Sequence, residues 1–453
     1  MSGATGEPMP VRLDAIRECF EGVIPATMAT ASNDGTPNVA YLSQVHFIDN
    51  EHVALSYQFF NKTRQNIMAN PYATLSLTNP STIAQYRLSL AYLRTETSGP
   101  LFESMKAKLA GIASHSGMAG VFRLLGADVY RVHAIEAVPG AAISPPPARR
   151  NLLAALRAWH ERMSGCTDLE SLLAESLACL QQYFSIDHTM VLMVDAPGER
   201  LYTVASRGYE ESGVGSEIQV GHGVIGVAAR ERIPIRIGHM NSEYAYGRAV
   251  RQSAKDSAWA DGLETEIPLP GLPESRSQLA VPIMAAQRLL GVLYVESPQD
   301  LRFTYDDEDA LVCLAGQLGM AVHTLQNASE GHEDAQADQA TPHQPSGAPL
   351  VVRRYPENDS VFLGDDYLIK GVAGSILWTI LSDFVEKRRI DFTNRELRLD
   401  PRVRLPDVSD NLEARLILLS KRLLERAAPI RIEKTGRGRF RLCVDRPIQL
   451  RSS

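Results

Sequence analysis

The stretch that decides the fold runs from Phe392 to Val444 and contains FTNREL (392–397), SDNLEARLILLSKRLLERA (409–427) and IRIEKTGRGRFRL (430–442). In the middle piece, leucines recur at helical spacing and predict a buried stripe along one helix: Leu412, Leu416, Leu419 and Leu423. Another face of this helix carries amide and basic side chains: Asn411, Arg415, Arg422 and Arg426. The last piece alternates apolar and charged residues around a turn at 435–438, which predicts a hairpin.

The neighbouring residues complete a small domain over 351–446. Thr393 and Glu396 have capping-box spacing for a short helix, two short strands flank a turn at 364–366, and a helix is expected over 371–387. A short helix, a longer helix with a basic face and an Arg-tipped hairpin together predict a winged helix-turn-helix.

This segment resembles the winged-helix output domain of two-component response regulators. The resemblance implies that the long helix enters the major groove of double-stranded DNA and that the hairpin contacts phosphates. The residues it assigns to DNA are Asn411, Arg415, Lys421 and Arg422 on the helix, and Arg437 and Arg439 on the hairpin.

Charge is unevenly distributed along the chain. Residues 351–453 hold 21 Lys and Arg against 15 Asp and Glu, whereas the remainder holds 25 against 38. A basic excess confined to the last segment of an acidic protein is typical of a body with a nucleic-acid-binding end. The alternative is an amphipathic helix whose polar face is solvated, in a winged-helix fold used for protein contacts.

Length and composition limit the remaining choices. A chain of 453 residues predicts two to four domains. It has no apolar run of about 18 residues and no signal pattern in MSGATGEPMP, so we expect a cytoplasmic protein with no membrane partner. Five scattered cysteines without a CxxC pair argue against a disulfide framework and against a zinc site. The common phosphate-loop, nucleophile-elbow and metalloprotease motifs are missing from the sequence, so no catalytic residue is assigned.

Residues 11–140 contain β-rich runs separated by turn signals at 33–35, 49–50 and 79–81, which predict a small antiparallel barrel. The runs ATMATASNDGTPNVAYLS (26–43) and NKTRQNIMANP (61–71) resemble the pyridoxamine 5′-phosphate oxidase-like split barrel. The resemblance implies FMN at a dimer interface, with Lys62, Thr63 and Asn66 on its phosphate and the strand carrying Thr27 and Thr30 against its ring. A phosphate dianion favours such a set of cation, hydroxyl and amide. Heme, a deazaflavin or no cofactor are the alternatives.

A Pro- and Ala-rich linker at 141–151 leads into a second unit over 152–325. The runs GHGVIG (221–226), LAVPI (279–283) and GVL (291–293) resemble a GAF domain, an α/β sandwich. The resemblance implies a small-molecule pocket under a capping loop, for which residues 239–259 offer Tyr244, Tyr246, Arg248 and Trp259. The alternative is that these side chains pack within the loop itself.

Residues 326–350 are polar and poor in large apolar side chains, which predicts a flexible tether. We therefore expect a multidomain α+β protein composed of a split β-barrel, a GAF domain and a winged helix-turn-helix. The predicted function is that of a homodimeric one-component transcriptional regulator, in which a ligand changes the spacing of two winged helices on DNA. The alternatives are an FMN-dependent oxidoreductase with regulatory GAF and winged-helix parts, and a signalling scaffold.

Overall fold

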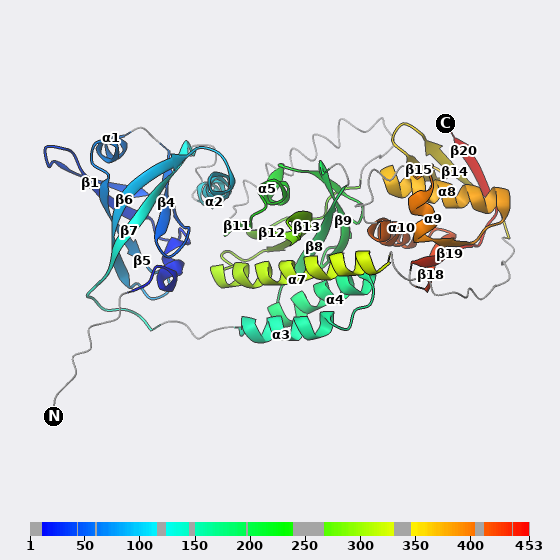
Figure 1. The fold of residues 1–453 in the computed structure, drawn as a ribbon, viewed down its shortest axis with the longest axis horizontal. Helices are drawn as coiled ribbons and strands as arrows, with labels where there is room; N and C mark the ends of the chain where they lie inside the picture. The colour runs from blue at the N-terminus through cyan, green and yellow to red at the C-terminus, as the bar shows by residue number, and fades with distance from the viewer. Residues whose placement is uncertain are drawn as a thin grey trace, which may run out of the picture.

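The computed structural model consists of three units that follow one another along the long axis of the molecule (Figure 1). It describes residues 11–42, 44–58, 61–115, 124–144, 150–195, 198–238, 267–329, 346–403, 412–436 and 438–452. Several predicted site residues lie outside this set: Tyr244, Tyr246, Arg248, Trp259, Asn411 and Arg437.

The first unit is a curled antiparallel sheet of seven strands, in the order β2-β1-β5-β6-β7-β4-β3. The two longest strands pair along most of their length, with register shifts at Ser89/Leu90 and Tyr92/Arg94. Such irregularities bend a strand, which is what a sheet needs in order to curl into a half-barrel. The elements are η1 (Asp14–Phe20), β1 (Ala26–Ala31), β2 (Pro37–Leu42), β3 (Val45–Phe47), β4 (His52–Tyr57), α1 (Lys62–Ala69), β5 (Tyr72–Thr78), β6 (Gln85–Glu96), α2 (Pro100–His115) and β7 (Gly126–Val138).

The central unit is a six-stranded sheet, in the order β10-β9-β8-β13-β12-β11, with helices on both faces. Helices α3, α4 and α7 share one core with the sheet, and α5 shares another with its opposite face. Gly319 lets α7 approach the sheet closely, because a Cβ atom there would lie 2.2 Å from the Met284 carbonyl oxygen. The elements are α3 (Leu152–Met163), α4 (Leu169–Phe184), β8 (His188–Val194), β9 (Arg200–Arg207), β10 (Glu217–Gln219), α5 (Gly223–Glu231), β11 (Ile235–Ile237), β12 (Ser277–Ala285), β13 (Arg288–Ser297) and α7 (Tyr305–Ser329).

The C-terminal unit places three helices between a four-stranded sheet, β16-β15-β14-β20, and a three-stranded sheet, β17-β19-β18. The helix expected over 371–387 is present with those bounds, and Thr393 and Glu396 form the predicted capping box. Strand β20, which the sequence did not predict, pairs in parallel with β14. The elements are β14 (Leu350–Tyr355), β15 (Ser360–Leu363), β16 (Asp366–Ile369), α8 (Gly371–Lys387), β17 (Asp391–Thr393), α9 (Asn394–Leu399), α10 (Leu412–Glu425), β18 (Ile430–Gly436), β19 (Arg439–Val444) and β20 (Ile448–Ser452).

The first and central units meet around a buried arginine on β11. The Arg236 guanidinium contacts Glu21 and Glu308, each at 2.6 Å, and donates to the Phe303 carbonyl oxygen at 3.1 Å. It also lies over the ring of Tyr305, 4.3 Å from the ring centroid. Because Glu21 follows η1 and Glu308 belongs to α7, this one side chain joins two units.

Three side chains, one each from η1, α2 and α7, lie around this contact. Tyr305, the first residue of α7, packs with the core residues of the first unit. Lys108 of α2 donates to the Phe20 carbonyl oxygen at 2.7 Å, and burial lowers the pKa of its ammonium to about 8. At the rim, Arg17 contacts Asp306 at 3.0 Å and Asp309 at 2.8 Å. The start of α7 is thus held by the first unit.

Within the described part of the chain, no helix is long and apolar enough to cross a membrane. All five cysteines are free thiols. The described residues include no group of three or more His, Cys, Asp or Glu side chains placed to hold a metal ion.

We expect Arg236→Ala to lower the free energy of unfolding by about 2–3 kcal/mol, because it leaves two half-buried carboxylates without their shared cation. Urea denaturation of the full chain measures this change. Arg288→Ala, at an exposed position where β13 begins, is the matched control and should change stability by less than about 0.5 kcal/mol. Equal effects of the two substitutions would show that the Arg236 contact does not stabilise the protein.

Candidate functional site

A cleft of about 300 Å³ lies on the first unit beside the start of α1. Its wall is apolar and aromatic, and polar groups gather near the helix start. The lining residues are Met28, Ala40, Tyr41, Leu42, Leu55, Ser56, Tyr57, Gln58, Asn61, Thr63, Arg64, Ile67, Asp128 and Tyr130. An apolar wall with a few polar groups at one end is the usual composition of a site for a small ligand or cofactor.

Hydrogen bonds between α1 and the β1–β2 pair lie beside the cleft, and of the residues that they join only Thr63 is among its lining residues. The Asn66 amide is buried and donates to Thr30 Oγ1 at 3.1 Å. The Asn38 amide donates to Thr63 Oγ1 at 2.9 Å. Thr30 and Asn66, both predicted to contact a cofactor, therefore bond to each other and fix α1 across β1.

The remaining predicted cofactor contacts have different surroundings. Thr63 lines the cleft, whereas Lys62 is exposed at the first position of α1 and Thr27 is half-buried on β1, outside the lining set. The Asn61 side chain caps the helix by accepting from the Arg64 amide at 3.1 Å. Lys62 and the helix-end amides belong to the first turn of α1, and the dipole at this end of a helix favours an anion.

Arg64 is the cleft residue that the sequence reasoning missed. Its guanidinium donates to both oxygens of Asp128 at 2.6 Å and to Thr95 Oγ1 at 2.9 Å, and it lies 4.5 Å from the ring centroid of Tyr57. Burial raises the pKa of the Asp128 carboxyl, and the Thr95 and Arg64 contacts oppose that rise. Asp128, the charged partner of Arg64, lies 64 residues further along the chain, and no local motif indicates that the two residues pair.

In the central unit, the face of the sheet under α5 is filled by an apolar core. The Tyr294 hydroxyl donates to Glu296 at 3.3 Å, and Glu296 also accepts from the Leu272 amide at 3.0 Å. The predicted ligand contacts of this unit lie outside the described residues, so their role stays a prediction.

Helix α10 packs between its own unit and the central one. The Arg415 guanidinium lies 3.6 Å from the ring centroid of Tyr202, and Arg415 is 8% exposed. Lys421 Nζ donates to the Val204 carbonyl oxygen at 3.3 Å, and Arg422, which is 7% exposed, donates to the Leu368 carbonyl oxygen at 3.3 Å. Arg415, Lys421 and Arg422 are therefore covered, whereas Arg426 of the predicted basic face is exposed, and the role of this helix in binding DNA stays a prediction.

The hairpin after α10 holds the remaining predicted DNA contact that the structure describes. Arg439 is half-buried where β19 begins and lines a hollow of about 90 Å³ together with Asn394, Glu413 and Lys434. Lys434 contacts Asp168 of the central unit at 3.5 Å and Glu413 at 3.6 Å. The hairpin thus also contacts the central unit, through a residue close to its turn.

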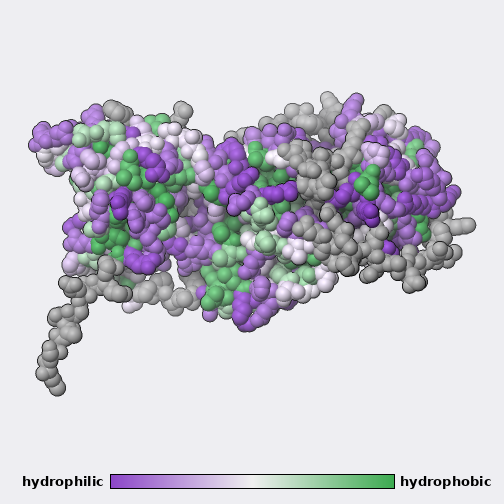
Figure 2. Space-filling view, viewed as in Figure 1, coloured by the Kyte–Doolittle hydropathy of each residue, from purple (hydrophilic) through white to green (hydrophobic). Residues whose placement is uncertain are grey.

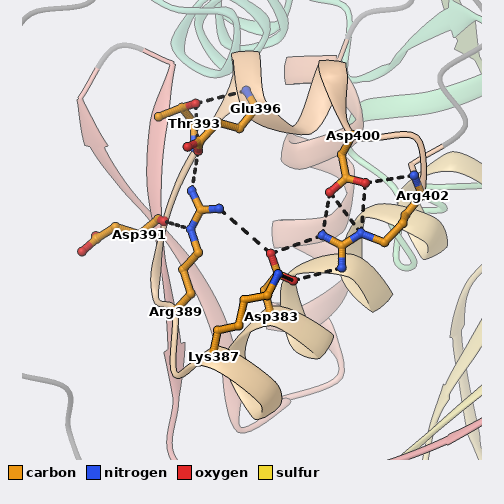
Figure 3. Close-up of polar contacts among 8 residues, drawn as sticks. All are labelled: Asp383, Lys387, Arg389, Asp391, Thr393, Glu396, Asp400 and Arg402. Carbon is orange, nitrogen blue, oxygen red and sulfur yellow. Dashed lines mark hydrogen bonds and ion pairs between the residues drawn. The ribbon is translucent and has the colours of Figure 1, made fainter.

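A network of charged side chains fixes α8 to α9 and to the turn that follows α9 (Figure 3). The buried Asp383 carboxylate accepts from the Arg402 guanidinium at 2.9 and 3.2 Å and from Lys387 at 3.0 Å. Arg389 reaches both Asp383 and the capping residue Glu396. These contacts bind basic side chains of the C-terminal unit to carboxylates of the same unit.

Two family models match this chain. The pyridoxamine 5′-phosphate oxidase family matches residues 13–136, and the GAF domain family matches residues 168–322. The chain therefore contains a split-barrel domain and a GAF domain, which confirms two of the three predicted resemblances. Neither match extends into the C-terminal unit, where the winged-helix resemblance stays a prediction.

Among curated proteins, the chain is 43% identical over 54 residues to an uncharacterized protein of Methanocaldococcus jannaschii. The match covers 12% of this chain and 36% of that protein, so the chain spans about a third of the length of this relative.

Solved structures resemble single domains of the chain. The GAF domain of an Acinetobacter phosphoenolpyruvate-protein phosphotransferase is 19% identical, with 40% of this chain and 97% of that chain covered and a TM-score of 0.31. An FMN-binding protein from Syntrophomonas wolfei is 16% identical, with 28% of this chain and 86% of that chain covered and a TM-score of 0.24. A free methionine-R-sulfoxide reductase from Neisseria meningitidis is 21% identical, with 39% of this chain and 91% of that chain covered and a TM-score of 0.30.

The Asp383 network predicts a loss of stability in acid. Hydrogen bonds from Arg402 hold the pKa of the Asp383 carboxyl below its ordinary value. A carboxyl group of this kind contributes stability that is present above its unfolded-state pKa, about 3.9, and is lost as the pH falls through its lower folded-state pKa. We expect Asp383→Asn to lower the free energy of unfolding by about 1–3 kcal/mol at neutral pH. In calorimetry, the melting temperature of this variant should also fall less steeply as the pH is lowered. Asp366→Asn, at an exposed position of the same unit, should leave both unchanged.

Proposed function

We propose that this protein is a sensor-regulator that binds a flavin-type cofactor in its split barrel and a small molecule in its GAF domain, and that binds double-stranded DNA through its C-terminal unit. The two matched domains support a sensory or flavin-binding role. One observation carries the DNA-binding part: α9 and α10 are followed directly by the β18–β19 hairpin, with Arg439 beside its turn. This order of elements is that of a winged helix, whose second helix reads the major groove.

The cleft on the first unit supports FMN as the cofactor class. Lys62, Thr63 and the amides of the first turn of α1 would hold the phosphate, because they combine a cation, a hydroxyl and helix-end donors. The apolar wall at Ala40 and Leu42 would cover one side of the ring. A bound flavin would supply redox chemistry. Arg64 would keep the α1 end of the cleft in place through its contacts with Asp128 and Thr95.

Exposed apolar side chains support a homodimer. On β2 of the first unit Tyr41 is 83% exposed and Val39 66%, and on β5, the strand beyond β1, Tyr72 is 64% exposed. Figure 2 shows further apolar residues over α3 and the beginning of α7, where Leu153 is 79% exposed. Val39 and Tyr41 are two positions apart on β2 and therefore share one face of the sheet, and an exposed apolar patch usually marks a protein contact. A second copy would cover it and would bring two C-terminal units into one assembly.

The cofactor proposal is tested by titrating the full-length protein, after removal of any bound flavin, with FMN and following flavin fluorescence. We expect Lys62→Ala to weaken FMN binding about tenfold, because a charge-assisted contact to phosphate is lost. Lys106→Ala, on an exposed Lys of α2, is the matched control and should bind like the wild type. Failure of the wild-type protein to bind FMN would exclude the flavin assignment.

The DNA proposal is tested by the salt dependence of binding to a fluorescein-labelled 40-bp duplex of random sequence. We expect affinity to fall steeply with salt, and Arg439→Ala to weaken binding and to reduce the logarithmic salt slope by about one. Arg451→Ala, on the exposed strand β20, removes the same charge and should leave the slope unchanged. No measurable binding at low salt would refute a DNA-binding function.

A further inference from the structure

We propose that the central unit holds α10 in a closed position, and that DNA binding requires α10 to leave this surface. The inference rests on the DNA-binding function proposed above and concerns its regulation. We call the contact the α10 clasp. It is formed by Tyr202, Val204, Ser212, Gly215 and Glu217 of the central unit, and by Lys370, Arg415, Leu418, Lys421, Arg422 and Glu425 of the C-terminal unit.

The clasp uses the side chains that would otherwise meet DNA. Arg415 lies against the face of the Tyr202 ring, and a guanidinium in that position has exchanged its hydration for an aromatic surface. Lys421 donates to a backbone carbonyl of β9. Neither group can reach a phosphate or a base edge while β9 covers it, because DNA would have to occupy the same space.

Arg422 is held by a chain of contacts that crosses between the two units. Its Nη1 atom contacts Glu425 at 3.0 Å, and the Ser212 hydroxyl donates to the same carboxylate. The carboxylate neutralises the arginine and is itself positioned by the central unit. Separating the units removes the Ser212 contact from Glu425, whereas the hydrogen bond from Arg422 to the Leu368 carbonyl oxygen lies within the C-terminal unit and remains.

Charge complementarity supports the chain's own central unit as the occupant of this face. Glu217 contacts Lys370 at 3.5 Å and Asp168 contacts Lys434 at 3.5 Å, so carboxylates of the central unit meet ammonium groups of the C-terminal unit in both pairs. These carboxylates take the place of DNA phosphates. A polyanion and the central unit would therefore compete for one basic surface.

The connection between β9 and β10 gives the clasp a route to the rest of the GAF domain. Gly215 has a φ of +92°, and a Cβ atom there would lie 2.7 Å from Ile267 Cδ1 and 3.9 Å from both Leu418 Cδ2 and Arg422 Cδ. A Cβ atom at Gly213 would lie 2.0 Å from Pro270 Cδ. A movement of residues 267–270 would therefore displace the surface on which α10 rests.

The test compares charge-reversed variants of the full-length protein. Lys370→Glu should set two carboxylates against each other and open the clasp. It should thereby raise affinity for the random-sequence 40-bp duplex about three- to tenfold, although it adds negative charge. Glu217→Lys should act in the same direction, and the double reversal should restore wild-type affinity. Glu199→Lys, an exposed carboxylate of the same unit, controls for net charge.

A second measurement follows α10 directly, by hydrogen–deuterium exchange of residues 412–425. Faster exchange in Lys370→Glu, reversed in the double variant, is expected together with the change in affinity. Affinities that simply follow net charge, with α10 exchange unchanged, would overturn the clasp and leave the DNA-binding function standing. Faster exchange with no DNA binding by any variant would refute the DNA-binding function, and the inferred regulation with it.

Discussion

The arrangement of the molecule depends on one buried guanidinium. Arg236 is almost fully enclosed and draws its two counter-charges from Glu21 in the first unit and from Glu308 on α7. A charge at this depth is tolerated only when both partners and the remaining hydrogen bond are in place, because desolvation costs more than an imperfect ion pair returns. The split barrel and α7 are therefore constrained to one relative position, and a small displacement of either would leave a charge buried without its partner.

Helix α7 extends this constraint through the central unit. It begins with Tyr305 among the core side chains of the barrel, crosses the sheet closely at Gly319, and ends at Ser329. The barrel cleft and the GAF sheet are thus connected by packed side chains and a continuous helix. Coupling between distant sites can be carried by packed side chains and rigid helices of this kind. If a ligand shifts the barrel relative to β11, the start of α7 is the first element that must respond.

Local patterns predicted local structure well. The spacing of Thr393 and Glu396 specified a capping box, and apolar periodicity defined the helix over 371–387, because both signals act within a few residues. The pairing of Arg64 with Asp128, and that of Arg236 with Glu21, join residues 64 and 215 positions apart, and no local signal encodes such contacts. Periodicity placed Arg415 and Arg422 on the polar face of their helix. It could not reveal that Tyr202 and Leu368 cover that face, because an aromatic ring and a backbone carbonyl accept a guanidinium as solvent does.

The charge distribution has two meanings in this fold. An acidic body joined to a basic C-terminal unit is expected of a nucleic-acid-binding protein. Here the same difference in charge also attracts the C-terminal unit to the central unit, through the pairs Glu217–Lys370 and Asp168–Lys434. Salt screens these partly exposed pairs as well as contacts to phosphate. Raising the salt concentration should therefore open the protein while weakening its hold on DNA, and the observed salt slope should be shallower than the number of phosphate contacts implies. A shallow salt slope would then reflect competition between the central unit and DNA for the C-terminal unit. It would not mean that the protein makes few phosphate contacts.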